Sequence, residues 1–257
     1  MRSPTHRTDR VDSRRANASF RHPHRMTDAT RPQVHADSER HITVQRTGRY
    51  VVMGDDRATD VWVCIHGFGQ LARRFARDMG ALVAPHRKIV VPEALNRYYI
   101  EAPGVEPQHR KVGATWMTKE DRETDIADYV AYLDALHARE VAPLAARGAR
   151  VTALGFSQGV TTLVRWAVRG QSRLDRLVCW AGALPHDVDL TEPAVAARLH
   201  AMRPLEMAIG DSDEFASWAA IDEQRAKLAA ASIPAVFHFF TGGHVIDGPL
   251  LASIAQG

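Results

Sequence analysis

A serine between two glycines marks the segment RVTALGFSQGVTTLV, residues 150–164. Gly155, Ser157 and Gly159 form the pattern G-x-S-x-G where an apolar run changes into a segment with helical periodicity. In such a pattern a strand turns sharply into a helix and exposes the serine hydroxyl at the turn. Because a chain of this length contains the bare pattern by chance about one time in ten, partners for Ser157 must be sought elsewhere in the sequence.

Acid and base candidates follow two later apolar runs. GDSDEF follows LEMAI and contains Asp211 and Asp213, and TGGH follows AVFHFF and ends in His244. A serine hydroxyl is a weak nucleophile at neutral pH, so it needs a base within hydrogen-bond reach and a carboxylate that fixes the tautomer of that base. Ser157, His244 and one of the two aspartates could fill these roles. His238 is a weaker alternative base, because alternation along its strand would hide it.

A glycine-containing loop could complete this chemistry. The run DVWVCI is followed by HGFGQ, residues 66–70, in which two glycines let the backbone approach a ligand. Attack on an ester carbonyl creates an oxyanion, and the backbone N–H groups of Phe68 and Gln158 are the expected donors to it. The side chains of Phe68 and Gln158 would then be free to vary. We expect His66 to hold the loop rather than to react.

The elements that must position these residues alternate along the chain. HITVQ and RYVVMG predict an antiparallel N-terminal hairpin, and DVWVCI predicts the next strand. From residue 70 onward, apolar strand-like runs alternate with segments of helical periodicity, and Thr118 with Asp121 predicts a capping box for a long helix. This alternation predicts an α/β fold with a doubly wound, mostly parallel sheet and helices on both faces. In such sheets, ligands bind at the carboxyl ends of the strands, where the candidate residues stand.

Length and charge indicate one catalytic domain, residues 41–257, after a disordered Arg-rich segment, residues 1–40. The 257 residues are 45% hydrophobic, enough for one large core. Residues 1–40 hold nine Arg and five acidic residues, whereas the whole chain has a net charge of only +3. The remainder therefore lacks the basic surface that nucleic acid requires, and no nucleic-acid partner is expected. Met26 is an alternative translation start.

The remaining composition argues for a protein of the cytoplasm. Cys64 and Cys179 each lie inside an apolar run, where a free thiol behaves as a small core residue. Two such cysteines do not make a disulfide framework, which favours a reducing compartment. No apolar run has the length of a membrane span. No cluster has metal-ligand spacing, and the chemistry above needs no cofactor.

Together, HGFGQ, GFSQG, GDSD and GGH resemble the phospholipase/carboxylesterase branch of the α/β-hydrolase superfamily, which includes acyl-protein thioesterases. The resemblance covers residues 42–257 and implies an α/β-hydrolase fold without a large cap domain. It also favours Asp213 over Asp211 as the triad acid. The chain departs from the family at Val160, where a third glycine is usual, and at Glu214, where a proline is common.

The sequence thus predicts a serine hydrolase that cleaves a small carboxylic ester through an acyl-enzyme. A thioesterase or lysophospholipase would use the same machinery, and a non-catalytic binding protein on the same fold is the alternative of another class. Tyr98, Tyr99, Trp116 and Met117 lie between a predicted strand and the long helix and could line an apolar substrate pocket. Simple packing is the competing interpretation of these four side chains.

Overall fold

The structure is a computed structural model that describes residues 39–100, 104 and 106–257. Residues 46–257 form one compact unit. Residues 39–45 are the described end of the unit that precedes it, and they contain no helix or strand. The segment 1–38, which holds most of the predicted disordered region, lies outside the described residues.

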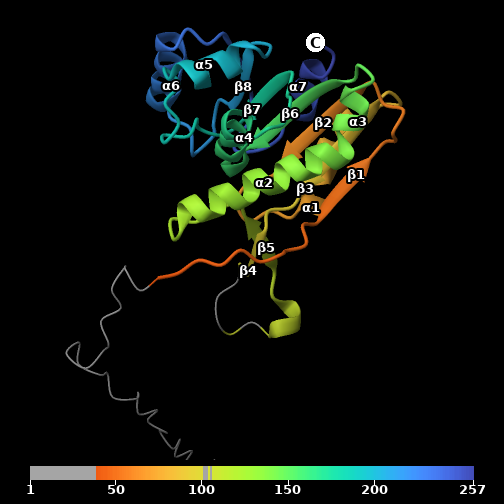
Figure 1. Cartoon of the computed structure of the whole chain (residues 1–257). Helices are drawn as coiled ribbons and strands as arrows, with labels where there is room; N and C mark the ends of the chain where they lie inside the picture. The colour runs from red at the N-terminus through yellow and green to blue at the C-terminus, as the bar shows by residue number, and fades with distance from the viewer. Residues whose placement is uncertain (1–38, 101–103, 105) are drawn as a thin grey trace, which may run out of the picture. The chain divides into compact units, whose positions relative to one another are not determined.

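Strands and helices alternate along the compact unit (Figure 1). The strands are β1 (Tyr50–Met53), β2 (Asp60–Ile65), β3 (Arg87–Pro92), β4 (Asn96–Tyr99), β5 (Val112–Thr115), β6 (Arg150–Phe156), β7 (Arg176–Trp180), β8 (Leu205–Gly210) and β9 (Ala235–Phe240). The helices are α1 (Ala72–Asp78), α2 (Arg122–Glu140), α3 (Ala142–Ala145), α4 (Gln158–Arg169), α5 (Pro193–His200), α6 (Trp218–Ala230) and α7 (Gly248–Ile254). Shorter 3-10 helices are η3 (Met79–Leu82) and η4 (Pro107–His109). No helix of the described residues is both long enough and apolar enough to cross a bilayer.

The main sheet has the strand order β1-β3-β2-β6-β7-β8-β9. All its neighbouring strands pair in parallel except β1, which is antiparallel to β3. The predicted mostly parallel sheet with an antiparallel N-terminal strand is therefore confirmed. The predicted partner of that strand is wrong, because Tyr50 pairs with Pro92 and residues 41–45 form no strand. Alternation in a sequence identifies a strand but does not identify the edge on which it pairs.

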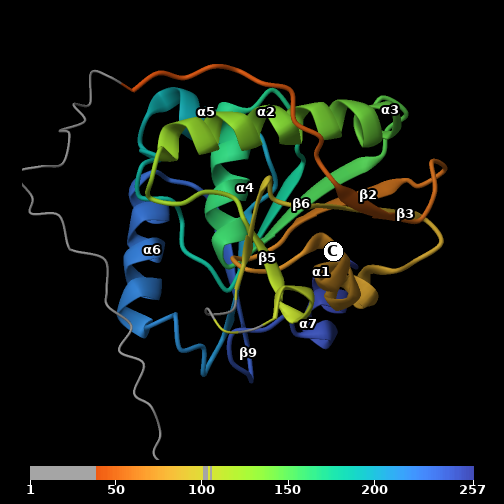
Figure 2. The ribbon, with the colours of Figure 1, turned by 90° about the horizontal axis from the view of Figure 1, so that it is seen from below.

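Two apolar layers cover the sheet on opposite faces, as strand β2 illustrates. Val61, Val63 and Ile65 belong to the core cluster beneath α2, α4, α5 and α6, whereas Trp62 and Cys64 belong to the cluster beneath α1 and α7. Side chains alternate between the two faces of a strand, and a strand buried on both faces is apolar throughout. Figure 2 shows α1 and α7 on one side of the sheet and α2 on the other. Helices on both faces were predicted and are confirmed.

Carboxyl ends of adjacent parallel strands meet at one edge of this sheet. The register pairs Ile65, at the end of β2, with Gly155 on β6. His66 and Ser157 therefore begin loops on neighbouring strands, and Asp211 and the TGGH segment follow β8 and β9 farther along the same edge. The fold thus brings the candidate residues to one edge from distant parts of the sequence.

Between β3 and α2 the chain forms a small antiparallel sheet that the sequence did not indicate. Strand β4 pairs with β5, with Asn96 opposite Thr115. Helix α2 begins at Arg122, and the Thr118 hydroxyl donates to the Glu120 carbonyl rather than capping the helix. The predicted capping box is therefore wrong.

Candidate active site

Ser157 occupies a strained turn between β6 and α4. Its φ of 54° and ψ of −119° lie outside the conformations that side-chain-bearing residues ordinarily adopt. Glycines allow this turn to be tight: a Cβ on Gly155 would lie 2.3 Å from the Gly159 carbonyl oxygen, and one on Gly159 would lie 2.3 Å from the Ile65 carbonyl oxygen. The Ser157 N–H donates to the Trp180 carbonyl at 2.9 Å, which ties the turn to β7. The predicted strand-turn-helix context of the G-x-S-x-G pattern is present.

His244 and Asp213 meet across the loops that follow β9 and β8. Nδ1 of His244 lies 2.9 Å from Oδ2 and 3.1 Å from Oδ1 of Asp213, whose side chain is fully buried. Oδ1 also accepts the Phe215 N–H at 2.9 Å. The imidazole packs against Phe156 and Phe215, with ring centroids 5.0 and 4.8 Å away. A carboxylate facing Nδ1 requires the proton there, which leaves a lone pair on Nε2 of the neutral ring.

The alternative acid and base make other contacts. Asp211 is exposed, and its Oδ1 accepts the Gly242 N–H at 3.1 Å. Nε2 of His238 lies 3.0 Å from Oε2 of Glu206. The sequence left Asp211 and Asp213 open as partners of the histidine, and the hydrogen bonds pair Asp213 with it.

Ser157 and His244 line two cavities. The first, here called the loop-side cavity, has a volume of about 480 Å³ and is also lined by Gly67, Phe68, Gln70, Asp78, Phe156, Val245 and Ile246. The second, here called the helix-side cavity, has a volume of about 340 Å³ and is also lined by Gln158, Thr161, Ala181, Gly182, Ala183, Ile209, Phe215, Ala216, Ala220, Ile221 and Gln224. Apart from the histidine, no described residue in the lining of the helix-side cavity is ionisable, whereas the lining of the loop-side cavity includes Asp78. Burial raises the pKa of the Asp78 carboxyl.

The loop after β2 is held by a buried neutral histidine. Nε2 of His66 accepts the Ala94 N–H at 3.0 Å, so Nδ1 carries the proton and donates to the Gly67 carbonyl at 2.7 Å. Burial lowers the pKa of His66 to about 4, which keeps the ring uncharged near neutral pH. The indole N–H of Trp116 donates to the His66 carbonyl at 2.9 Å. His66 thus holds the loop, as the sequence predicted.

Backbone donors beside Ser157 differ in whether they have partners. The N–H of Gly67 donates to the Gln70 side chain and that of Gly69 donates to the Ala114 carbonyl. Among the described residues, no protein acceptor takes the N–H of Phe68 or of Gln158. Two N–H groups next to the serine are therefore available to a ligand.

The Gln158 side chain has a role that sequence reasoning missed. Its amide nitrogen donates to Oγ1 of Thr115 and to the Met117 carbonyl, both at 3.0 Å, and its oxygen accepts the Trp116 N–H at 3.2 Å. These bonds tie the turn at Ser157 to the end of β5. The prediction that this side chain is free to vary is wrong, and no local pattern could have shown it, because its partners lie about forty residues away in the sequence.

The four predicted pocket residues line neither of the two cavities at Ser157. Trp116 is fully buried in the core, and Met117 contacts the buried Arg165 through its sulfur at 3.3 Å. Tyr98 packs against Phe68 with ring centroids 5.4 Å apart, and Tyr99 is exposed. None of the four lines the loop-side or the helix-side cavity.

Both cysteines are buried free thiols. Burial raises the pKa of Cys64 and raises that of Cys179 to about 12. Because the thiolate is the reactive form, these thiols are inert at neutral pH.

Comparison with known proteins identifies the fold and the family. The structure is similar to that of Zea mays acyl-protein thioesterase 2, with a TM-score of 0.63 and 19% identity over 82% of this chain and 97% of that one. It is also similar to a carboxylesterase from Mesorhizobium loti, with a TM-score of 0.61 and 16% identity over 81% and 93% of the two chains. A Bacillus cereus carboxylesterase gives a TM-score of 0.55 and 15% identity over 81% and 92%. No curated protein matches the sequence.

These neighbours share the α/β-hydrolase fold, and the sequence itself assigns the family. The model of the phospholipase/carboxylesterase family matches residues 47–255, which span the compact unit almost completely. The chain therefore belongs to the phospholipase/carboxylesterase family and is a hydrolase of the esterase type.

Proposed function

We propose that this protein is a serine hydrolase that cleaves small carboxylic esters through an acyl-enzyme intermediate. The observation that carries the proposal is the His244–Asp213 hydrogen bond beside Ser157. The carboxylate fixes the imidazole tautomer, and the histidine lines both cavities that the strained serine lines. This combination is the one that nucleophilic catalysis by serine requires.

In the proposed reaction, Ser157 Oγ attacks the ester carbonyl while Nε2 of His244 takes the hydroxyl proton. The tetrahedral intermediate collapses when Nε2 returns that proton to the departing alkoxide, which leaves as an alcohol. Water then enters, gives a proton to Nε2 and attacks the acyl carbonyl, and Ser157 departs with the proton that the histidine holds. Asp213 stabilises the imidazolium in both halves of the reaction. No cofactor takes part in these steps.

The N–H groups of Phe68 and Gln158 are the proposed oxyanion donors. Both lack a protein acceptor among the described residues, and Gln158 directly follows the nucleophile. Removing one such donor costs other hydrolases about two to three orders of magnitude in kcat. The hydrogen bonds of the Gln158 side chain would keep its backbone N–H in place.

The two cavities suggest how the substrate divides. The helix-side cavity has a mostly apolar lining and suits the acyl part, while the loop-side cavity, with Gln70 and Asp78, suits the leaving alcohol. A thioester or a lysophospholipid could use the same nucleophile and base. The similar structures include an acyl-protein thioesterase, so thioesters belong in the substrate panel.

Labelling with a fluorophosphonate probe tests the proposal, since the probe reacts only with an activated serine. We expect the wild-type protein to be labelled and Ser157→Ala to be unlabelled. Ser253→Ala removes an exposed serine of α7 and is the matched control, which should be labelled like the wild type. Absence of labelling in the wild type would favour the non-catalytic binding protein. A panel of p-nitrophenyl esters and acyl-CoA thioesters would then rank ester against thioester.

A further inference from the structure

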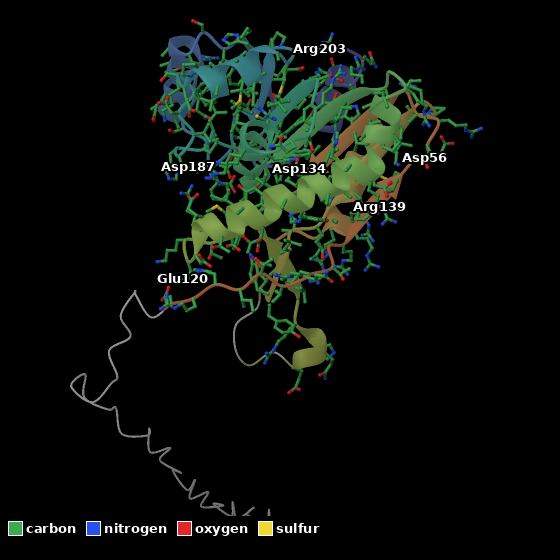
Figure 3. All side chains as sticks on the ribbon, in the orientation of Figure 1. Asp56, Glu120, Asp134, Arg139, Asp187 and Arg203 are labelled. Carbon is green, nitrogen blue, oxygen red and sulfur yellow. The ribbon has the colours of Figure 1, made fainter. Side chains whose placement is uncertain are left out.

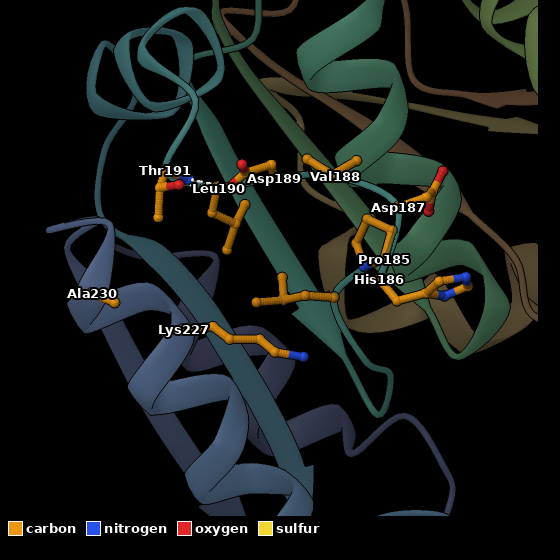
Figure 4. Close-up of a pocket in the computed structure, with 10 residues that line it drawn as sticks. Pro185, His186, Asp187, Val188, Asp189, Leu190, Thr191, Lys227 and Ala230 are labelled. Atoms are coloured by element: carbon orange, nitrogen blue, oxygen red, sulfur yellow. Dashed lines mark hydrogen bonds between the residues drawn. The ribbon is translucent and has the colours of Figure 1, made fainter.

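A further cavity lies beside helix α6 and shares no lining residue with the helix-side cavity (Figure 4). This distal cavity has a volume of about 420 Å³, and it lies between α6 and the loop after β7. Its lining comprises Leu184, Pro185, His186, Asp187, Val188, Asp189, Leu190, Thr191, Lys227 and Ala230. Neither Ser157 nor His244 lines it.

The two cavities share both of their walls. On α6, the helix-side cavity is lined by Ala220, Ile221 and Gln224, and the distal cavity by Lys227 and Ala230. Residues three and four apart lie on one face of a helix, so Ala220, Gln224 and Lys227 share a face of α6 that runs past both cavities for about 10 Å at 1.5 Å per residue. The opposite wall passes from residues 181–183 to residues 184–191.

One hydrogen bond joins a residue of the helix-side cavity to a residue of the distal cavity. Oε1 of Gln224 accepts the Leu184 N–H at 2.8 Å. Gln224 is the last α6 residue of the helix-side cavity, and Leu184 is the first loop residue of the distal cavity. The Gln224 side chain, here called the divider, therefore lies at the boundary between the two cavities.

Ion pairs hold the loop that lines the distal cavity, so the Gln224 side chain is the part of the boundary that is displaced more easily. Asp187 (labelled in Figure 3) lies 2.7 Å from the buried Arg165 guanidinium and 2.9 Å from that of Arg169. Burial would raise the pKa of Asp187, but the hydrogen bond and charge of Arg165 outweigh it and hold the pKa at about 2. The loop thus stays ion-paired to α4 at neutral pH. The Gln224 bond, by contrast, is a single neutral contact from a partly exposed side chain.

We propose that Gln224 sets the acyl chain length that the enzyme accepts, and that the distal cavity binds the end of longer acyl chains when the Gln224–Leu184 bond opens. This inference rests on the proposed ester hydrolysis. Apolar residues supply half of the lining, and the two aspartates in it already have partners: Asp187 pairs with Arg165, and Asp189 accepts the Thr191 hydroxyl. Lys227, which also lines the cavity, is ion-paired with Glu223 at 2.7 Å.

The experiment measures kcat/KM for p-nitrophenyl esters from acetate to palmitate. Within each variant, the value for each ester is divided by that for acetate, so differences in enzyme quality cancel. In the wild type we expect the ratio to rise with chain length until the helix-side cavity is full and then to fall. In Gln224→Ala the maximum should move to longer chains, and two further buried methylenes correspond to about a fifteenfold gain in the ratio.

Two further variants separate the divider from general effects of substitution. Ala230→Trp fills the distal cavity and, combined with Gln224→Ala, should abolish the gain for long chains. Asp222→Asn, at an α6 position outside both cavities, is the matched surface control.

A Gln224→Ala profile with the wild-type maximum, in a protein that hydrolyses acetate, would overturn the inference and leave the proposed function intact. A gain that survives Ala230→Trp would overturn the assignment of the distal cavity. A shift seen with alkyl acetates of increasing alcohol length, but not with the acyl series, would overturn the assignment of the acyl chain. If the wild type hydrolyses no ester, the proposed function fails and the inference fails with it.

Discussion

Replacing Asp213 by asparagine should place the proton on the wrong nitrogen of His244. Oδ1 of Asp213 accepts the Phe215 N–H at 2.9 Å, and Oδ2 faces Nδ1 of the histidine at 2.9 Å. In Asp213→Asn the amide oxygen keeps the bond to Phe215, because the flipped amide would set two donors against each other. The amide nitrogen then donates to Nδ1, which can accept only when the proton sits on Nε2. That nitrogen can no longer receive the Ser157 proton.

The expected loss is about four orders of magnitude in kcat, the effect of the same substitution in the best-studied serine triad. It corresponds to about 5.5 kcal/mol of lost transition-state stabilisation. Because Asp213 lines neither cavity at the serine, KM should change little. A loss confined to KM would contradict the mechanism.

Asp211→Asn is the matched control. Its Oδ1 accepts the Gly242 N–H, and the asparagine oxygen can keep that bond, so kcat/KM should stay within about twofold of the wild type. Both variants are assayed with p-nitrophenyl acetate at pH 8, with circular dichroism as a check of folding. A larger loss in Asp211→Asn would refute the assignment of the acid, and equal small losses would mean that the carboxylate comes from elsewhere.

Three further predictions concern the surroundings of the site. His238→Gln should keep kcat within about twofold of the wild type, because the His238 imidazole is hydrogen-bonded to Glu206 and lines neither cavity at the serine. A loss of kcat as large as that of Asp213→Asn would instead identify His238 as the base. Gly155→Ala should lower the free energy of unfolding by at least about 2 kcal/mol, because the added Cβ would lie 2.3 Å from the Gly159 carbonyl oxygen. Urea denaturation measures this change, and an unchanged urea midpoint would contradict the geometry of the turn. Folding lowers the pKa of His66 from 6.5 to about 4, so the free energy of unfolding is unaffected by this group above pH 6.5 and falls by about 3 kcal/mol as the pH drops to 4. His66→Gln should remove this part of the pH dependence, as measured by denaturation curves at several pH values. If the stability of the variant and of the wild type changed equally with pH, the prediction would be wrong.

The sequence predicted correctly those features that depend on a single segment of the chain. The change from a buried strand to an amphipathic helix at Ser157 is such a case, and β6 and α4 flank the serine as predicted. The long helix and the last strands were also recognisable from periodicity and length. The position of His66 at the end of a buried strand sufficed to predict that it holds a loop rather than reacts.

Features that depend on contacts between distant segments were not readable from the sequence. Asp211 and Asp213 stand two residues apart, and only the path of the GDSDEF loop decides which carboxylate meets the histidine. The strand paired with β1 and the cavities along α6 likewise depend on tertiary packing. The surroundings of Val160 also depend on packing, since it is buried beside Gly182, which has no side chain to occupy that space.

Detection of a covalent acyl-enzyme tests the central claim most directly. Wild-type protein is mixed with p-nitrophenyl acetate, quenched in acid within the first turnover and examined by intact-protein mass spectrometry and peptide mapping. We predict one acyl group on the peptide that contains Ser157, and none in Ser157→Ala, whose turnover should fall to a small residual while its melting temperature stays nearly unchanged. An acyl group on another residue, or undiminished turnover in Ser157→Ala, would contradict the account.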